Sequence, residues 1–142
     1  MKKLLLIITI FSSTFLFAQD NVILSQENAN EKGLTPLWPK CERSRQTPIK
    51  CFENNLRNHI VINFRYPEIA KKQRLEGTVT VEFIINTKGK VEVIEVEGGH
   101  RFLQVEAVRI IRTIPKMKPG RWGNKPIGIV YSVPITFIKP SK

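Results

Sequence analysis

Few side chains in this sequence have the types and spacing that catalysis requires. Histidine occurs only at His59 and His100, and neither has a nucleophile and an acid nearby in the chain. Glu92, Glu95 and Glu97 lie close together, but three carboxylates on one short strand are typical of a solvated surface. The sequence contains no Gly-rich phosphate loop and no nucleophile elbow. Because no set of catalytic roles is complete, we expect a protein that is not an enzyme and needs no cofactor.

The N-terminal residues predict export. Lys2 and Lys3 precede an apolar run from Leu4 to Phe17, and Ala18 is a small residue at a plausible cut site. A membrane-spanning helix needs ~20 predominantly apolar residues, and this run is shorter and contains hydroxyl side chains. We expect residues 1–18 to be a cleaved signal peptide. The alternative is an uncleaved segment that is retained as a membrane anchor.

The two cysteines, Cys41 and Cys51, are the remaining reactive side chains. An even number of cysteines in an exported protein favours a disulfide. Closing so short a loop contributes about 2.5–3 kcal/mol in the chain-entropy view. Two cysteines do not make a zinc site, and the two histidines offer no ligand spacing. We therefore expect a structural disulfide and no metal.

The charge balance is strongly basic. Lys and Arg number 23 against 12 Asp and Glu, a formal net charge of +11. Such a charge favours an acidic partner or an anionic surface, or serves only solubility. Nucleic acid is a poor candidate for an exported protein, so an anionic envelope polymer is one partner to expect.

The elements that position these side chains begin after a polar leader. Residues 19–40 lack periodicity, which predicts a flexible segment. A helix is predicted over Lys50–Asn63, with Thr47 as its cap. With Cys41 it would form a disulfide-tied helical extension over residues 41–65. A second, short helix is expected from Pro67 to Leu75.

Alternating apolar residues predict three strands, over Thr78–Asn86, Val91–Glu97 and Ile127–Ile138. The phase slips near Val93, which predicts a bulge. A helix over Leu103–Ile114 separates the second strand from the third. Short, right-handed connections then place the third strand beside the first.

The predicted fold class is α+β, a three-stranded antiparallel sheet of order 2-1-3 with two helices on one face. The extra N-terminal helix precedes this unit. Pro134 has no N–H for a ladder, which places the last strand at the border of the sheet. An unpaired border offers N–H and C=O groups to an extended peptide. Basic residues expected nearby, which would attract an acidic peptide, are Arg109, Arg112, Lys116, Lys118 and Arg121.

An ordered set of short motifs resembles the TonB C-terminal domain family. The set consists of Tyr66-Pro67-Glu68-Ile69-Ala70, Gly77 to Ile85, Gly89-Lys90-Val91, Glu106-Ala107, Pro115, Pro119-Gly120, Gly123 to Ile127 and Val133 to Phe137. The resemblance covers Tyr66–Lys139. The residues around Trp38 and Cys41, with Cys51 and Phe52, also resemble the segment that precedes this domain in some members, which supports pairing the two cysteines.

The resemblance implies a periplasmic domain over residues 66–139 that docks to outer-membrane transporters. Its last strand would pair with a short receptor segment, the TonB box. Mapped onto this sequence, the docking residues are Ile127, Gly128, Ile129, Val130, Tyr131, Ser132 and Val133.

Three functions stay open. The first is a periplasmic binding domain that adds an extended peptide, such as a TonB box, as a strand. The second is a membrane-anchored TonB energy transducer with an uncleaved signal, and the third is a basic envelope protein that binds an anionic polymer. A fully extended leader over residues 21–37 reaches only ~50–60 Å, which favours the first. A homodimer through strand exchange is a further expectation at such a border.

Overall fold

The computed structural model describes residues 22–139 and residue 141, so the expected signal peptide lies outside the described residues. Within them a five-stranded sheet organises the fold. Its strands are β1 (Ile23–Ser25), β2 (Gly77–Ile85), β3 (Val91–Glu97), β4 (Gly120–Trp122) and β5 (Lys125–Phe137). The helices are α1 (Gln26–Glu31), α2 (Pro48–Asn63), α3 (Glu68–Lys72) and α4 (Arg101–Arg112), with a 3-10 turn η1 (Cys41–Arg43).

The three expected strands are β2, β3 and β5, and they pair in the expected order. β2 is antiparallel to β3 on one side and to β5 on the other. Two strands were not expected: β4 pairs antiparallel with the start of β5, and β1 pairs parallel with β5. Each is three residues long, too short to show a period of two. The α+β class is confirmed, with a larger sheet.

Alternation along β2 and β5 builds the core. Val79, Val81, Phe83 and Ile85 are fully buried on one face, and β5 places Ile129, Tyr131, Ile135 and Phe137 on the same face. The opposite face carries Thr80, Glu82 and Ile84 from β2. We call this side, away from α2 and α4, the open face of the sheet.

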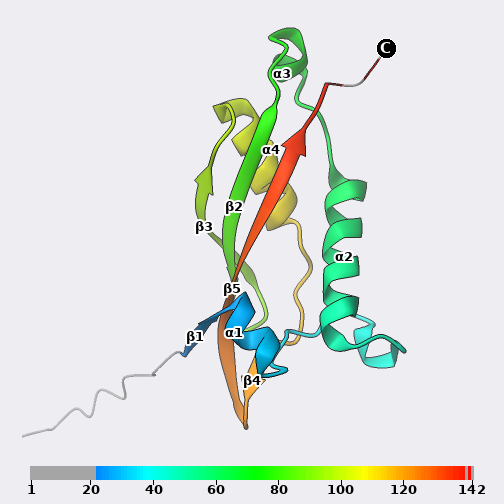
Figure 1. Cartoon of the computed structure of the whole chain (residues 1–142), viewed down its shortest axis with the longest axis vertical. Helices are drawn as coiled ribbons and strands as arrows, with labels where there is room; N and C mark the ends of the chain where they lie inside the picture. The colour runs from blue at the N-terminus through cyan, green and yellow to red at the C-terminus, as the bar shows by residue number, and fades with distance from the viewer. Residues whose placement is uncertain (1–21, 140, 142) are drawn as a thin grey trace, which may run out of the picture.

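Two helices cover the buried face: α4, which we expected, and α2 in place of the short helix over Pro67–Leu75. α4 packs on β2 and β3, and α2 lies alongside it (Figure 1). Phe52 of α2 stacks on Tyr131 of β5, with ring centroids 4.7 Å apart. The helix expected over Pro67–Leu75 is the short α3 at one end of the sheet. Ala70 is its one buried residue, so α3 has too little apolar surface to cover a sheet.

The expected bulge is present on β3. Glu82 of β2 is opposite Glu95, whereas the next residue, Phe83, is opposite Val93. Ile94 is therefore the extra residue, and its side chain is 52% exposed. The bulge resets the phase, so that the strand's valines face the helices and its three glutamates, Glu92, Glu95 and Glu97, face away.

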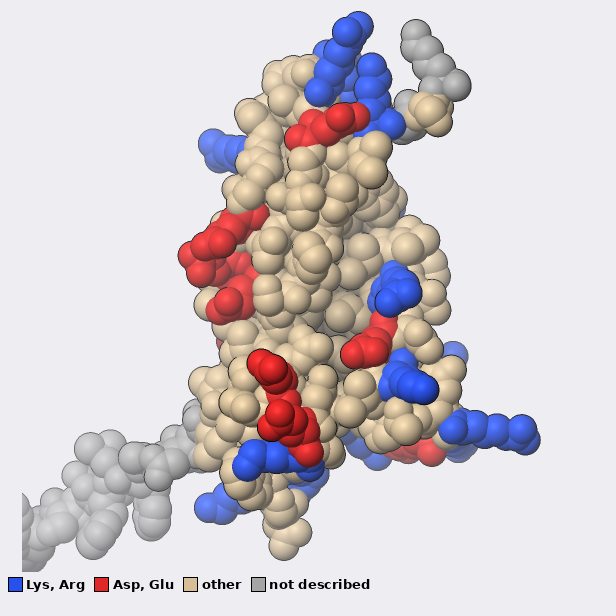
Figure 2. Space-filling model, in the orientation of Figure 1, with Lys and Arg blue, Asp and Glu red and all other residues tan. Residues whose placement is uncertain are grey.

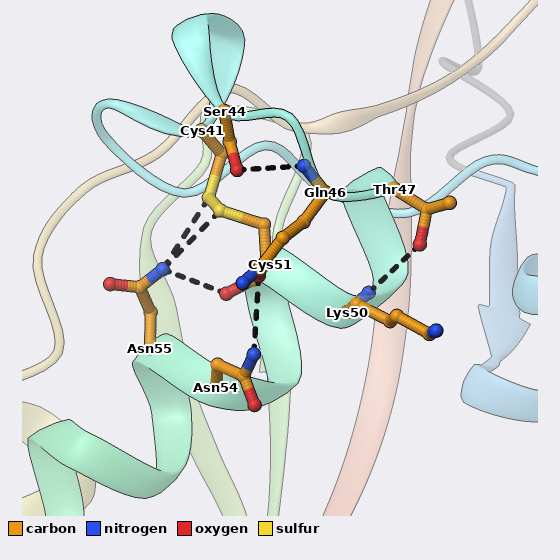
Figure 3. The surroundings of a disulfide bond; sticks show 8 residues. All are labelled: Cys41, Ser44, Gln46, Thr47, Lys50, Cys51, Asn54 and Asn55. Carbon is orange, nitrogen blue, oxygen red and sulfur yellow. Dashed lines mark hydrogen bonds between the residues drawn. A yellow bond between two sulfur atoms is a disulfide. The ribbon is translucent and has the colours of Figure 1, made fainter.

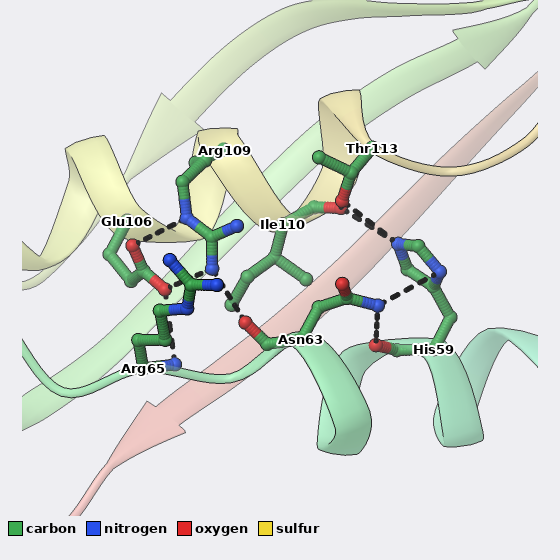
Figure 4. Close-up of polar contacts among 7 residues, drawn as sticks. All are labelled: His59, Asn63, Arg65, Glu106, Arg109, Ile110 and Thr113. Carbon is green, nitrogen blue, oxygen red and sulfur yellow. Dashed lines mark hydrogen bonds and ion pairs between the residues drawn. The ribbon is translucent and has the colours of Figure 1, made fainter.

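A polar network joins α2 to α4 (Figure 4). The Glu106 carboxylate, which is almost buried, accepts hydrogen bonds from Arg109 Nε at 2.9 Å and Nη2 at 2.6 Å. Arg109 Nη2 also donates to the Asn63 carbonyl at 2.5 Å. His59 Nε2 lies 3.0 Å from the Ile110 carbonyl oxygen. The ion pair with Glu106 orients Arg109 within α4. The contacts from Arg109 to Asn63 and between His59 and Ile110 cross between the helices and fix the helical layer that packs on β5.

The two cysteines form a disulfide, with Cα atoms 6.0 Å apart (Figure 3). It joins η1 to the first turn of α2, where Lys50 N donates to Thr47 Oγ1 at 3.4 Å as the expected cap. Asn55 Nδ2 donates to the Cys51 carbonyl at 2.7 Å. The bridge thereby fixes the position of Phe52, the residue after Cys51 that stacks on β5.

The leader differs from the flexible segment that we expected. From Ile23 on it forms β1 and α1, and Ala29 of α1 is fully buried. Trp38 is also buried and packs edge-on against Phe52, with ring centroids 5.9 Å apart. The polar composition of the leader did not predict these contacts, because only a few of its side chains are buried.

Candidate peptide-binding site

The side of β5 that faces away from β2 is its outer edge, and residue parity decides what this edge presents. Gly128 N–H donates to the Val22 carbonyl at 3.0 Å, so the backbone of Gly128 points outward. Successive residues of a strand direct their N–H and C=O groups to opposite sides. The register with β2 is unbroken from Ile129 to Phe137. The backbone N–H and C=O groups of even-numbered residues therefore point to the outer edge, and those of odd-numbered residues bond to β2.

The sequence-predicted docking residues divide by this rule. Gly128, Val130 and Ser132 direct their backbone groups to the outer edge. The other four have no backbone groups on the outer edge, and their side chains face the helices: Ile127, Ile129, Tyr131 and Val133. Ile127 also pairs in register with Gly120 of β4. Only three of the seven predicted residues thus direct backbone groups toward a further strand.

Part of this edge is already occupied. β1 runs parallel to β5, with Ile23 opposite Gly128, Leu24 opposite Ile129 and Ser25 opposite Val130. This differs from the free border that we expected. The physical reason is that a short apolar run just before α1 can satisfy exposed backbone groups. Beyond it, in the described residues, the outward groups of Ser132 have no strand partner.

Pro134 lies at a position where its missing N–H costs no hydrogen bond with β2. As an even-numbered residue it points outward, so its place opposite Thr80 removes no bond from the ladder with β2. It also ends the run of outward donors that begins at Gly128. The edge available to a peptide is therefore short.

Two hollows flank β1 on the open face of the sheet, the face that Figure 2 views. One, of about 490 Å³, is lined by Ser25, Gln26, Glu27, Asn30, Glu82, Val130 and Ser132. The other, of about 330 Å³, is lined by Ile23, Ile84, Asn86, Thr87, Lys88, Glu92 and Gly128. A peptide on the outer edge would direct alternate side chains into these hollows.

The basic residues that we expected beside the docking strand lie mostly elsewhere. Arg109 pairs with Glu106, and Lys118 pairs with Glu42. Arg112 lies on α4, and of the five only Arg121 is on a strand that pairs with β5. Carboxylates gather instead on the β3 side of the open face (Figure 2). Attraction of an acidic peptide by these cations is therefore not supported at the edge.

Tyr131 belongs to the core, although it lies in the predicted docking stretch. Its ring lies between Phe52 and Phe83, with a centroid distance of 5.7 Å to the latter. Its hydroxyl is buried without a hydrogen-bond partner among the described residues. Burial raises the pKa of this hydroxyl, and the charge of Glu53 raises it further.

Residues 22–139 contain no metal-ion cluster and no helix that could span a membrane. No three His, Cys, Asp or Glu side chains come together there in a way that would hold a metal ion. None of the helices found there has both the length and the apolar character needed to span a bilayer.

The fold agrees with the longer of two solved structures to which this chain is similar. Two NMR structures of the C-terminal domain of Helicobacter pylori TonB are similar. The longer has TM-score 0.51 and 24% identity over 64% of this chain and 83% of its own; the shorter has TM-score 0.43 and 23% identity over 61% and 92%. The search of curated proteins found no match. The family model for the C-terminal region of Gram-negative bacterial TonB proteins matches residues 62–138. As that match spans more than half of the sequence, the protein belongs to the TonB C-terminal domain family.

Proposed function

We propose that this protein is a periplasmic binding domain that performs no chemical step. It takes an extended segment, such as the TonB box of an outer-membrane transporter, as an added strand on the outer edge of β5. We call this segment the guest peptide. One observation carries the proposal: the same edge already holds a strand, β1, through the bond from Gly128 N–H to the Val22 carbonyl.

The guest peptide replaces β1 and runs in the same direction as β5. It reaches the outward groups of Gly128, Val130 and Ser132, one position beyond the end of β1. Each backbone hydrogen bond contributes only about 0.5–1.5 kcal/mol net, and part of this gain offsets the loss of β1. The expected affinity is therefore weak to moderate.

The test uses synthetic TonB-box peptides from outer-membrane transporters and the exported form of the chain. Val130→Pro removes one outward N–H and leaves the ladder with β2 intact, as Pro134 already does in the same strand. We expect at least a tenfold loss of affinity by calorimetric titration. Thr136→Pro is the matched control, because it makes the same change on the same edge beyond the docking stretch.

Two outcomes overturn the proposal. One is unchanged binding in Val130→Pro, and the other is an equal loss in Thr136→Pro. Amide exchange locates the guest peptide independently, since slower exchange on binding is expected at Ser132 and not on β3.

The anchored transducer is distinguished by the N-terminus of the exported protein. A chain that begins at Gln19 supports the cleaved form. An intact Met1 end overturns it and favours a retained anchor.

A further inference from the structure

At Gly128 the outer edge of β5 carries no side chain on the open face. Its backbone does not require glycine, because its φ lies outside the left-handed region in which Gly123 lies, at φ 61°. Glycine in a strand weakens the strand and often marks a place where another group approaches closely.

Two isoleucines occupy the space. A Cβ atom on Gly128 would lie 2.9 Å from Ile84 Cδ1 and 3.5 Å from Ile23 Cγ1. Ile84 comes from β2, and Ile23 stands directly opposite Gly128 on β1. We call the space over Gly128, between Ile84 and the strand on the outer edge, the Gly128 notch.

The notch is larger than its present occupant. It opens into the hollow of about 330 Å³ that Asn86, Thr87 and Lys88 also line. Ile23 is 57% exposed, so it covers the notch without filling it. The floor of the notch is the Ile84 side chain and bare backbone, which favour an apolar group.

We infer that the Gly128 notch is a side-chain subsite that selects the guest peptide, and that it takes a large apolar residue such as Ile, Leu or Phe. This inference rests on the proposed docking at β5. β1 shows the pattern that the guest peptide follows: a large apolar residue over Gly128, an apolar residue opposite Ile129, and a small polar residue opposite Val130.

The notch also sets the register. At the next outward positions, Val130 and Ser132 carry side chains on the open face, so a guest side chain meets a neighbour there instead of a gap. A shift by one residue turns every guest side chain to the other face. A shift by two residues moves the large apolar residue from Gly128 to Val130. Only one register therefore fills the notch.

The test changes the size of one side chain in the peptide and of one side chain in the protein, and measures binding. The probes are two synthetic hexapeptides with the sequence of residues 21–26, one with Ile and one with Gly at the position of Ile23. We expect the exported protein to bind the Ile peptide at least tenfold more tightly. Gly128→Val should fill the notch and reduce this preference to within twofold. Thr136→Val, on the same edge and face but beyond the docking residues, should keep it.

The protein's own β1 provides a second measurement that needs no guest peptide. Amide exchange of Leu24 reports on β1 pairing, and we expect it to be at least fivefold faster in Ile23→Gly and in Gly128→Val. Gly128→Ala is the milder variant if valine prevents folding, with a smaller change of the same sign.

The outcomes separate the two proposals. Equal binding of the two hexapeptides to the unmodified protein overturns the notch and leaves docking in place. Binding of neither hexapeptide, together with no binding of TonB-box peptides, overturns docking. If docking is overturned, the exchange rate of the Leu24 amide still tests the notch. An unchanged rate in Ile23→Gly and Gly128→Val overturns the notch, and a faster rate in both supports it as the site that holds the Ile23 side chain.

Discussion

The outer edges of β3 and β5, the sides that face away from β2, differ in how they receive an additional strand. β3 is bulged at Ile94 and carries Glu92, Glu95 and Glu97, all exposed. β5 keeps an unbroken register with β2 and has no charged side chain after Lys125. Bulges and charges are the usual means of preventing edge-to-edge pairing. The chain applies both to β3 and neither to β5.

The difference indicates that the outer edge of β5 is suited to pairing with an additional strand. Over Gly128, Ile129 and Val130 its protection is a strand of three residues, β1, which the proposed guest peptide would replace. β3 is protected by its own side chains and backbone, which cannot be removed. Binding is therefore expected at one border only, and the following changes test this contrast.

The largest effect is expected from removing the charges of β3. Replacing Glu92, Glu95 and Glu97 together by Val leaves a β-branched apolar border and should cause self-association at micromolar concentrations. Sedimentation velocity measures the change in mass. Replacing the exposed Glu27, Glu31 and Glu53 by Val is the charge-matched control, and an equal rise in mass there would contradict the contrast.

A smaller effect is expected from weakening the cover of β5. Ile23→Gly combined with Leu24→Gly leaves the chain length unchanged but reduces β1 pairing. Because β1 competes as a tethered strand, affinity for TonB-box peptides should rise about fivefold in titrations. Unchanged affinity would mean that β1 does not cover the docking surface.

Tyr131→Phe tests the parity rule within β5. The change removes a buried hydroxyl without a partner in the described residues, so the free energy of unfolding in urea should rise by about 1 kcal/mol. Guest affinity should not change, because Tyr131 faces the core and its backbone pairs with β2. A tenfold loss of affinity would show that odd-numbered residues take part in docking.

The same residue predicts a pH effect. Since burial raises the pKa of Tyr131 in the folded state, the unfolded chain loses this proton first. Stability should therefore be intact below pH ~10 and fall above it, by up to about 1.4 kcal/mol per pH unit from this group. Urea unfolding at several pH values should show a shallower fall in Tyr131→Phe. Identical slopes would argue against a buried hydroxyl.

The smallest effect is expected from salt. An uncharged edge that binds through its backbone should change its guest affinity less than about threefold between 50 and 500 mM salt, because there is little charge to screen. Titration at the two salt concentrations measures this. A steep loss would instead favour the anionic polymer as partner.

Much of this contrast follows from the sequence. Alternation locates β2, β3 and β5, and the phase slip predicts a bulge near Val93, which the structure places at Ile94. Pro134 marks the side of β5 that does not pair with β2. These signals are local, because each depends on the period of a strand or on one missing N–H. The helical stripe from Phe52 to Leu56 likewise predicts α2.

What covers each surface is not local. A run of three residues in a polar leader shows no period, and β1 exists only because Gly128 and its neighbours, more than a hundred residues away, accept it. The choice of α2 over α3 to cover the sheet depends on Phe52 meeting Tyr131. Nor does the sequence reveal that Gly128 lies beneath two isoleucines, since a glycine in a strand has several explanations.

The anchoring of α1 has a consequence for the rate at which a guest peptide is exchanged. Ala29 is fully buried, Leu34 N–H donates to its carbonyl at 2.9 Å, and Lys32 Nζ lies 4.3 Å from the Trp122 ring centroid. These contacts hold the leader in place after Ser25, so we expect the proposed release of β1 to leave the rest of the domain folded. Opening is then a local event of a few residues, and its speed does not depend on global unfolding.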